Sequence, residues 1–327
     1  MIKKLALLTG ALLVSGNAMA AEKTMRCSHQ LPPTHHIAKV IDQWAAEVES
    51  QSGNSIDVQI FGANSLRDAK LNIPAVAKGD IECALSVNFQ WGKTVPLMSV
   101  TLKPYALTDL AILSKWDGSP AAKFLEEKLL EKGVRNVNWL FTTRMSAYTS
   151  KGSALIAPGD FKGVKIRGIN SLNDAGLLAL GAAPSAMSGS KVYQALSTGV
   201  IDAGLTDISA AVSRKYYEVQ DHVTASPLFS VFFHGYVNPA WYDGLSDAQK
   251  TALQLAGKKS AQWALDATEA SAKDAPAQLM EKGVKVHIHS DAEAAAMKAI
   301  MGPAFDKAFA EATGEDGTKL LGLISKM

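Results

Sequence analysis

Arg167 has the residue type and the position that most clearly suggest binding chemistry. It follows residues 164–166, a short run that we predict to be a strand, so its guanidinium stands at the strand's carboxyl end. Ligands of open α/β sheets bind outside the carboxyl ends of the strands. A guanidinium presents a planar fork of N–H donors that matches a carboxylate. The position therefore predicts an organic-acid clamp, whereas an isolated surface arginine more often forms a salt bridge.

Polar and aromatic side chains follow another predicted strand, at residues 80–87. Asn88 and Gln90 offer hydrogen bonds, and Phe89 and Trp91 offer apolar walls. Ligand pockets usually combine an apolar lining with a few placed polar groups. We therefore expect these four residues to face a binding cleft, although aromatic side chains at such a turn can instead cap the core.

No set of residues supports catalysis or a bound metal. Residues 188–191 fit the S-x-x-K pattern of penicillin-recognising enzymes, but the partner motifs S-D-N and K-T-G do not follow. Histidines occur at residues 29–36 and 287–289, yet no cysteine or paired carboxylate completes a metal site. We find no nucleophile with a base and an orienting group. The sequence predicts a binding protein without a cofactor or a metal.

Alternating strand and helix patterns predict an α/β fold that positions these residues. Residues 24–29 read as a strand, and apolar residues at helical spacing follow up to Gly53. Residues 56–60 alternate like a half-buried strand, and a helix at 68–78 precedes the strand at 80–87. In a doubly wound sheet these three strands take the order 2-1-3, so the first and third are neighbours.

Residues 1–20 are typical of a secretory signal peptide. Lys3 and Lys4 precede a short apolar run, and the A-x-A sequence at 18–20 predicts cleavage after Ala20. The run is too short to span a bilayer. These two lysines belong to the 33 basic residues of the chain, so the exported part balances its 31 acidic residues. A balanced charge argues against nucleic acid as a partner, but not against a small anion.

Cys27 and Cys83 fall within the first and third predicted strands. Export permits a disulfide. Neighbouring parallel strands offer poor geometry for one, however. We therefore expect two buried thiols, with a bridge as the alternative.

Two segments with the same pattern indicate two similar lobes. Residues 75–85 and 195–205 both read as a helix, a glycine stop and a strand, with matching Ala, Gly, Ile and Leu. Junctions between helices and strands commonly share glycine stops, so coincidence is the alternative.

The C-terminal third is predicted to be largely helical. Ser246 and Gln249 form a capping-box pattern before a long helix that ends at Gly283. A helix of this length should bridge both lobes. A strand at 284–288 follows, and a further helix begins at Ala292 and breaks at residues 302–303.

Segment 160–220 combines Arg167 with short motifs in a fixed order. They are KGVKIR at 162–167, LGAAP at 180–184, VYQALSTGVID at 192–202 and KYYEVQ at 215–220. This order and spacing closely resembles the substrate-binding proteins of TRAP (tripartite ATP-independent periplasmic) transporters, dicarboxylate-receptor type. The resemblance covers nearly the whole exported chain.

The resemblance implies a periplasmic, two-lobed α/β protein with a mixed sheet in each lobe and a long helix spanning both. We assign residues 24–141 and 232–272 to lobe I, and residues 142–231 and 273–327 to lobe II. The implied function is capture of an organic-acid anion between the lobes and its delivery to the small and large membrane subunits of a transporter. A ligand-binding sensor subunit for a receptor kinase or a chemotaxis pathway is the alternative, because its binding chemistry would be identical. A periplasmic enzyme would need acid–base pairs in the cleft, and none is visible.

The resemblance also implies roles for single residues. In that family the arginine at the position of Arg167 pairs with the carboxylate of the transported acid. Arg144 matches a second family arginine, which would either neutralise a second carboxylate or form a hinge salt bridge. Asn170, Ser188 and Asp207 complete the ligand-binding set that we predict.

Departures from the family pattern bear on the ligand. Thr206 replaces an asparagine that binds carboxylate in the family, and Leu205 replaces a glutamate that ligates a metal in some members. Lys191 replaces a family acid, and Gly189 removes bulk beside the site. Together with the nearby aromatic residues, these changes favour a monocarboxylate with an apolar or aromatic portion. Arg144 would instead suit a dicarboxylate.

Overall fold

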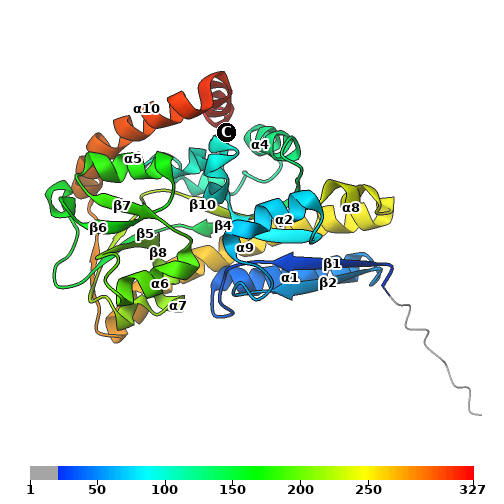
Figure 1. The fold of residues 1–327 in the computed structure, drawn as a ribbon, viewed down its shortest axis with the longest axis horizontal. Coiled ribbons are helices and arrows are strands. Elements are labelled where there is room, and N and C mark those ends of the chain that lie inside the picture. The colour runs from blue at the N-terminus through cyan, green and yellow to red at the C-terminus, as the bar shows by residue number, and fades with distance from the viewer. Residues whose placement is uncertain (1–20) are drawn as a thin grey trace, which may run out of the picture.

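The chain forms two lobes built on three sheets in the computed structural model, which describes residues 21–327 (Figure 1). The predicted signal peptide at residues 1–20 lies outside the described residues. The lobe I sheet has the order β2-β1-β3-β10-β4. Its strands are β1 (Lys23–Ser28), β2 (Ile56–Phe61), β3 (Cys83–Val87), β4 (Arg135–Thr143) and β10 (Val231–Val237).

The lobe I sheet is mixed. Strand β1 pairs in parallel with both β2 and β3, which confirms the predicted order 2-1-3. Strand β10 returns from lobe II and pairs antiparallel with β3 and β4. The surrounding helices are α1 (His36–Gln51), α2 (Asn72–Lys78), α3 (Leu110–Leu113), α4 (Pro120–Leu130) and α8 (Pro239–Asp243), with 3-10 helices η1 (Ala69–Leu71), η2 (Asn88–Lys93) and η3 (Pro96–Leu102).

The helices of lobe I follow from the apolar spacing of the sequence. The predicted stripe of α1 is buried, with Ile37, Val40, Ile41, Trp44 and Val48 facing the sheet core. The predicted helix at 68–78 forms as η1 followed by α2, whose first turn holds a proline. A proline is tolerated there because the first backbone N–H groups of a helix have no intrahelical partner.

Lobe II contains a mixed sheet of order β11-β9-β5-β8 and a two-stranded sheet β6-β7. A bridge between Ile166 and Ala203 joins the two sheets. The strands are β5 (Ser146–Ser150), β6 (Lys165–Gly168), β7 (Ala183–Ala186), β8 (Gly204–Asp207), β9 (His222–Ser226) and β11 (Lys285–Ile288). The helices are α5 (Ser171–Ala179), α6 (Gly189–Ser197) and α7 (Ile208–Ser213), with η4 (Pro158–Phe161) and η5 (Tyr216–Glu218).

Cys27 and Cys83 form a disulfide, so the expectation of two buried thiols was wrong. The two residues are direct partners in the parallel pairing of β1 and β3, and their Cα atoms lie 4.3 Å apart. This local register brings the two side chains together on one face of the sheet. Neighbouring parallel strands generally offer poor disulfide geometry, and this general rule does not reveal the register of one particular pair of residues.

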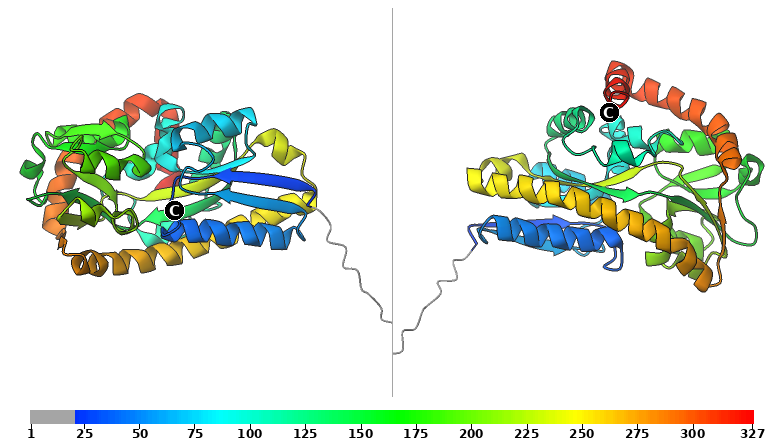
Figure 2. Two further views of the ribbon diagram at one scale, coloured as in Figure 1. Left: turned by 60° about the horizontal axis from the view of Figure 1, so that its bottom comes forward. Right: turned by 180° about the vertical axis from the view of Figure 1, so that it is seen from behind.

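The long helix α9 (Asp247–Glu281) confirms the predicted bridge between the lobes. Ser246 and Gln249 form the expected capping box, and Gly283, with a φ of 83°, follows its end. The helix packs on α1 and β4 of lobe I and on α7 and β11 of lobe II. The right-hand view of Figure 2, from behind, shows it in yellow to orange, crossing both lobes.

The last helix, α10 (Asp291–Ile324), continues through Pro303, so the predicted break at 302–303 was wrong. Met297, Met301, Phe305 and Phe309 recur every fourth residue and are buried, so one packed stripe continues across the proline. This burial offsets the backbone hydrogen bond that a proline removes. The non-helical backbone lies further on, at Gly314.

Helix α10 lies over both lobes (Figure 1). Its first part packs on α5 of lobe II. Its later part forms ion pairs with lobe I, between Lys103 and Asp306 and between Lys128 and Asp316, each at 2.8 Å.

Candidate functional site

A small cavity lies between the lobes, at the carboxyl ends of β3 and β6. Lobe I contributes the apolar Val87, Phe89 and Phe233 and also the polar Gln30 and His35. Lobe II contributes the charged groups of the lining beside apolar residues such as Phe229. The cavity has a volume of about 40 Å³, so it is suited to a compact ligand. The polar side chains that lobe II places in the lining include Arg167, Thr206, Asp207 and Arg214.

Arg167 is held rigidly in this cavity. Its side chain extends from β6 and the residue is only 4% exposed. Nε and Nη2 donate to the carbonyl oxygen of Met187, each at 3.2 Å, and Nη1 donates to that of Leu205 at 2.6 Å. An arginine carries five N–H donors, so each terminal nitrogen keeps one free N–H. These contacts aim the guanidinium without neutralising it.

Burial shifts the pKa values of Arg167 and of the nearby acid Asp174. Burial, together with the positive charge of Arg214, lowers the pKa of Arg167 to about 10. The side chain still carries its charge at neutral pH. Burial also raises the pKa of Asp174 to about 6, and this carboxyl accepts a hydrogen bond from the backbone N–H of Ile169. Among residues 21–327, no carboxylate lies within ion-pair distance of Arg167.

Asp207 ends β8 and caps the helix that follows. Its Oδ1 accepts hydrogen bonds from the backbone N–H groups of Ser209 and Ala210 and from the Ser209 hydroxyl. Burial raises the pKa of Asp207 to about 6, against the lowering effect of these hydrogen bonds. Thr206 precedes it and lines the same cavity.

Sequence reasoning missed Arg214, a second guanidinium at the cavity. It lies at the C-terminal end of α7, directly before the KYYEVQ motif. The structure links it to Gly189, because an added Cβ at Gly189 would lie 2.5 Å from Nη1 of Arg214. That contact joins residues far apart in sequence and therefore does not show in any local spacing.

Gln90, Asn170 and Ser188 line a neighbouring groove of about 400 Å³. Within the described chain, the amide of Gln90 and the hydroxyl of Ser188 have buried polar atoms without a partner. The amide nitrogen of Asn170 donates to the carbonyl oxygen of Phe89 and to the hydroxyl of Ser99. Phe89 lines both the groove and the cavity, so the two spaces adjoin.

Asn88 and Trp91 lie inside lobe I and line neither space. The Asn88 amide donates to Met98 O at 2.7 Å and to Thr101 Oγ1 at 2.8 Å. The indole N–H of Trp91 donates to His234 at 2.8 Å. These positions correspond to the core-capping alternative of the sequence analysis.

Arg144 also lies outside the cavity. Its Nη1 donates to Thr108 O at 2.7 Å, and its Nε lies 3.3 Å from a carboxylate oxygen of Glu269 on α9. This arrangement corresponds to the hinge salt bridge, the alternative to a second carboxylate clamp.

The lobes are held together across the cleft by polar contacts. Asn64 donates to the Ser190 hydroxyl at 3.1 Å. Lys191 forms an ion pair of 3.3 Å with Asp68, so the lysine that departs from the family pattern faces lobe I rather than the cavity. The structure therefore has the cleft closed.

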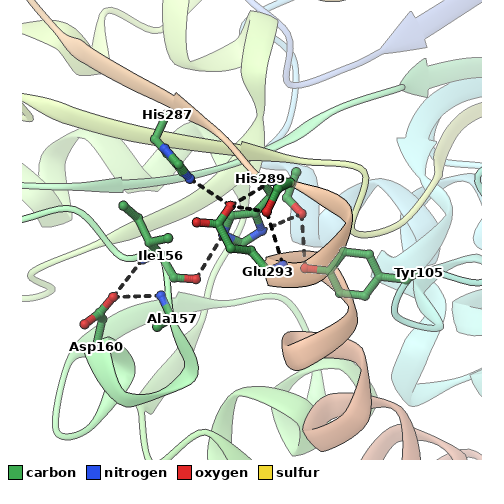
Figure 3. A network of polar contacts seen from close by, with 9 residues as sticks. Tyr105, Ile156, Ala157, Asp160, His287, His289 and Glu293 are labelled. Atoms are coloured by element: carbon green, nitrogen blue, oxygen red, sulfur yellow. Dashed lines mark hydrogen bonds and ion pairs between the residues drawn. The ribbon is translucent and has the colours of Figure 1, made fainter.

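A separate network braces the loop that carries Tyr105 against lobe II (Figure 3). The Tyr105 hydroxyl lies 3.1 Å from that of Ser226, which contacts Nδ1 of His289 at 3.0 Å. His287 contacts Glu293 at 3.0 Å. Within residues 21–327, no three potential metal ligands of the His, Cys, Asp or Glu types cluster together. None of the helices in this range is long and apolar enough to cross a bilayer.

The combination of two α/β lobes, a helix spanning both, and a buried guanidinium in a cavity between them defines a solute-binding receptor. Residues 27–312 match the family described as bacterial extracellular solute-binding protein, family 7, and the chain belongs to this family. It is 29% identical over 306 residues to the C4-dicarboxylate-binding periplasmic protein DctP of Rhodobacter capsulatus, covering 91% of this chain and 90% of the relative.

Solved structures agree with this family. The chain resembles a TRAP periplasmic solute-binding protein from Rhodoferax ferrireducens with bound malonate (TM-score 0.86, 26% identity, covering 92% of this chain and 97% of the other). It also resembles one from Roseobacter denitrificans with bound β-D-glucuronate (TM-score 0.84, 25% identity, covering 92% and 98%).

Family membership confirms several expectations. The resemblance to TRAP solute-binding proteins and the two-lobed α/β fold are confirmed. So is the function of a solute receptor, rather than an enzyme, that works with the membrane subunits of a transporter. The family is one of periplasmic proteins.

Proposed function

We propose that this receptor captures the carboxylate of a compact organic acid at Arg167, between the closed lobes. The observation that carries the proposal is the buried guanidinium of Arg167, which three backbone hydrogen bonds orient while leaving one free N–H on each terminal nitrogen. Two parallel N–H donors match a carboxylate. The malonate and glucuronate bound by the similar structures are both carboxylates.

The other predicted binding residues divide into two groups by position. Phe89, Thr206 and Asp207 line the cavity and would contact the acid itself. The adjoining groove is lined by Gln90, Asn170 and Ser188. These residues would contribute to closure of the lobes or to the path by which the ligand enters. Asn88, Trp91 and Arg144 would support the site from outside: the first two shape lobe I, and Arg144 braces the hinge.

The lobe boundaries stay part of the proposal. Lobe I would comprise residues 24–141 and 232–272, and lobe II residues 142–231 and 273–327. The later part of α10 is ion-paired to lobe I, so it would act as a strap between the lobes. Export would remove residues 1–20, and the mass of the protein recovered from the periplasm tests cleavage after Ala20.

A thermal-shift screen of purified protein against a library of organic acids tests the function. An acid that binds only the folded state stabilises it by about 2.7 kcal/mol at a hundredfold excess over its Kd. We expect compact carboxylates to raise the melting temperature and the corresponding amides and alcohols to leave it unchanged. A library in which no carboxylate shifts the melting temperature would contradict the proposal.

A further inference from the structure

Arg214 occupies space that only a glycine at position 189 leaves free. A Cβ built on Gly189 would lie 2.5 Å from Nη1 of Arg214 and 2.9 Å from both Nη2 and Cζ. Cβ contacts below about 3 Å essentially do not occur, so the guanidinium rests against the Gly189 backbone. The loss of bulk at position 189 therefore does not enlarge the cavity. Instead, the glycine leaves room for a second cation, the guanidinium of Arg214.

The Arg214 guanidinium has no partner among the described residues. It takes part in none of the ion pairs or side-chain hydrogen bonds within residues 21–327, and its Nε is buried without an acceptor. A buried donor without an acceptor costs free energy that a bound acceptor would recover. The side chain faces the same cavity as Arg167. The two like charges repel, since Arg214 contributes to the lowered pKa of Arg167.

The neighbouring acid attracts Arg214 without forming an ion pair with it, and the charge of Arg214 lowers the pKa of Asp207 against the larger raising effect of burial. Asp207 also faces the cavity, but its Oδ1 caps α7 through Ser209 and Ala210. No ion pair within 4.0 Å joins Asp207 to Arg214 in the described chain. The donors of Arg214 therefore stay available to a ligand that already has its carboxylate on Arg167.

We propose that Arg214, admitted by Gly189, determines specificity by binding a second oxygen acceptor group of the ligand. The ligand would be a compact acid that carries a further carboxylate or a keto oxygen close to its first carboxylate. The volume of about 40 Å³ requires the two groups to be near each other. An acid whose remainder is purely alkyl would leave Arg214 without an acceptor. This inference rests on the proposed function and replaces the earlier preference for an apolar monocarboxylate.

Calorimetry with three four-carbon probes tests it: succinate, 2-oxobutyrate and butyrate. The wild-type protein should bind at least one of the first two more tightly than butyrate. Arg214→Met should reduce that preference at least about tenfold, because a hydrogen bond to a charged group is lost. Arg214→Lys, which keeps the charge, should restore part of it. Preference for the keto acid over the diacid would identify the second group as a carbonyl, and the reverse as a carboxylate.

Gly189→Ala is the second variant, because its Cβ would displace the guanidinium while Arg214 itself remains. It should reduce the same preference. Gly159→Ala is the matched control, since a Cβ there meets nothing within 4 Å. An unchanged preference in both Arg214→Met and Gly189→Ala would overturn the inference, as would tighter wild-type binding of butyrate. Arg167→Lys separates the two claims: acid binding that survives it unchanged contradicts the proposed function instead.

Discussion

The side-chain amide nitrogen of Asn170, in lobe II, lies 3.0 Å from the carbonyl oxygen of Phe89, in lobe I, and donates a hydrogen bond to it. The same nitrogen donates to Ser99 Oγ at 2.9 Å. Its Oδ1 accepts from the backbone of α5, so Asn170 is fixed on its own lobe while it holds the other. Both residues line the groove, and we expect the bond to form only when the lobes are closed.

Loss of this bond should weaken ligand binding by favouring the open form. Asn170→Ser keeps a good helix cap but removes the amide donor. One or two hydrogen bonds at a net value of about 1 kcal/mol each predict an apparent Kd raised roughly five- to thirtyfold. Calorimetry measures the Kd. Small-angle scattering at subsaturating ligand should show a larger radius of gyration than in the wild type.

Gly92 should be required for the same contact. A Cβ there would lie 2.7 Å from Nδ2 of Asn170, so Gly92→Ala should hold the lobes apart. The expected result is a radius of gyration that no longer falls when ligand is added. Gly159→Ala, which meets no neighbour, should close like the wild type. Full closure by Gly92→Ala would show that Asn170 is not part of the latch.

The Cys27–Cys83 disulfide should contribute substantially to stability. It closes a loop with a sequence separation of 56 residues. The chain-entropy model assigns about 4 kcal/mol to a loop of that size, and measured values are typically about 2–4 kcal/mol. Urea unfolding with and without a reductant measures the difference, and a doubly substituted Cys27→Ala, Cys83→Ala protein should behave like the reduced form. Equal unfolding midpoints with and without the reductant would show that the disulfide does not contribute to the free energy of unfolding.

The pH dependence of stability should carry a contribution from Asp207. Burial raises its pKa in the folded state to about 6, from an ordinary 3.8. The folded state therefore favours the protonated carboxyl, and this stabilisation is complete below about pH 4 and is lost as the pH rises through 6. Asp207→Asn keeps the helix cap and removes the titration. Relative to this variant, the wild type should lose on the order of 3 kcal/mol between pH 4 and pH 7.

Unfolding curves of both proteins at several pH values in this range provide the measurement. The comparison isolates Asp207, because other titrating groups such as Asp174 are common to both. A constant difference between the two proteins from pH 4 to pH 7 would contradict the raised pKa.

Local patterns in the sequence predicted the elements, but not the contacts between distant elements. The stripe of α1 and the capping box of Ser246 follow from spacing within short segments, and the order 2-1-3 follows from the doubly wound fold class. The disulfide depends on the register of two strands, and the helix through Pro303 depends on packing against other elements. Neither the strand register nor the packing of this helix can be predicted from a short segment of sequence.

The same distinction applies to the cavity. Arg167 could be placed there from the sequence because its strand and its motif are local. Arg144 matches a motif as well, but its acceptors are Thr108 and Glu269, which lie far away in the chain. Arg214 became recognisable only through its contact with Gly189. Spacing identifies a candidate cation, and tertiary contacts decide whether it remains available to a ligand.

The central claim concerns the free N–H donors of Arg167, and the affinity of Arg167→Ala for the best acid of the screen tests it most directly. Loss of a charge-assisted pair from a closed cleft should cost roughly 2–5 kcal/mol, which raises the Kd about thirtyfold to several thousandfold. Arg135→Ala, an arginine at the start of β4 outside the cavity, is the control and should bind like the wild type. Thermal unfolding checks that both variants are folded. Unchanged calorimetric affinity in folded Arg167→Ala would contradict the assignment of Arg167 as the carboxylate clamp.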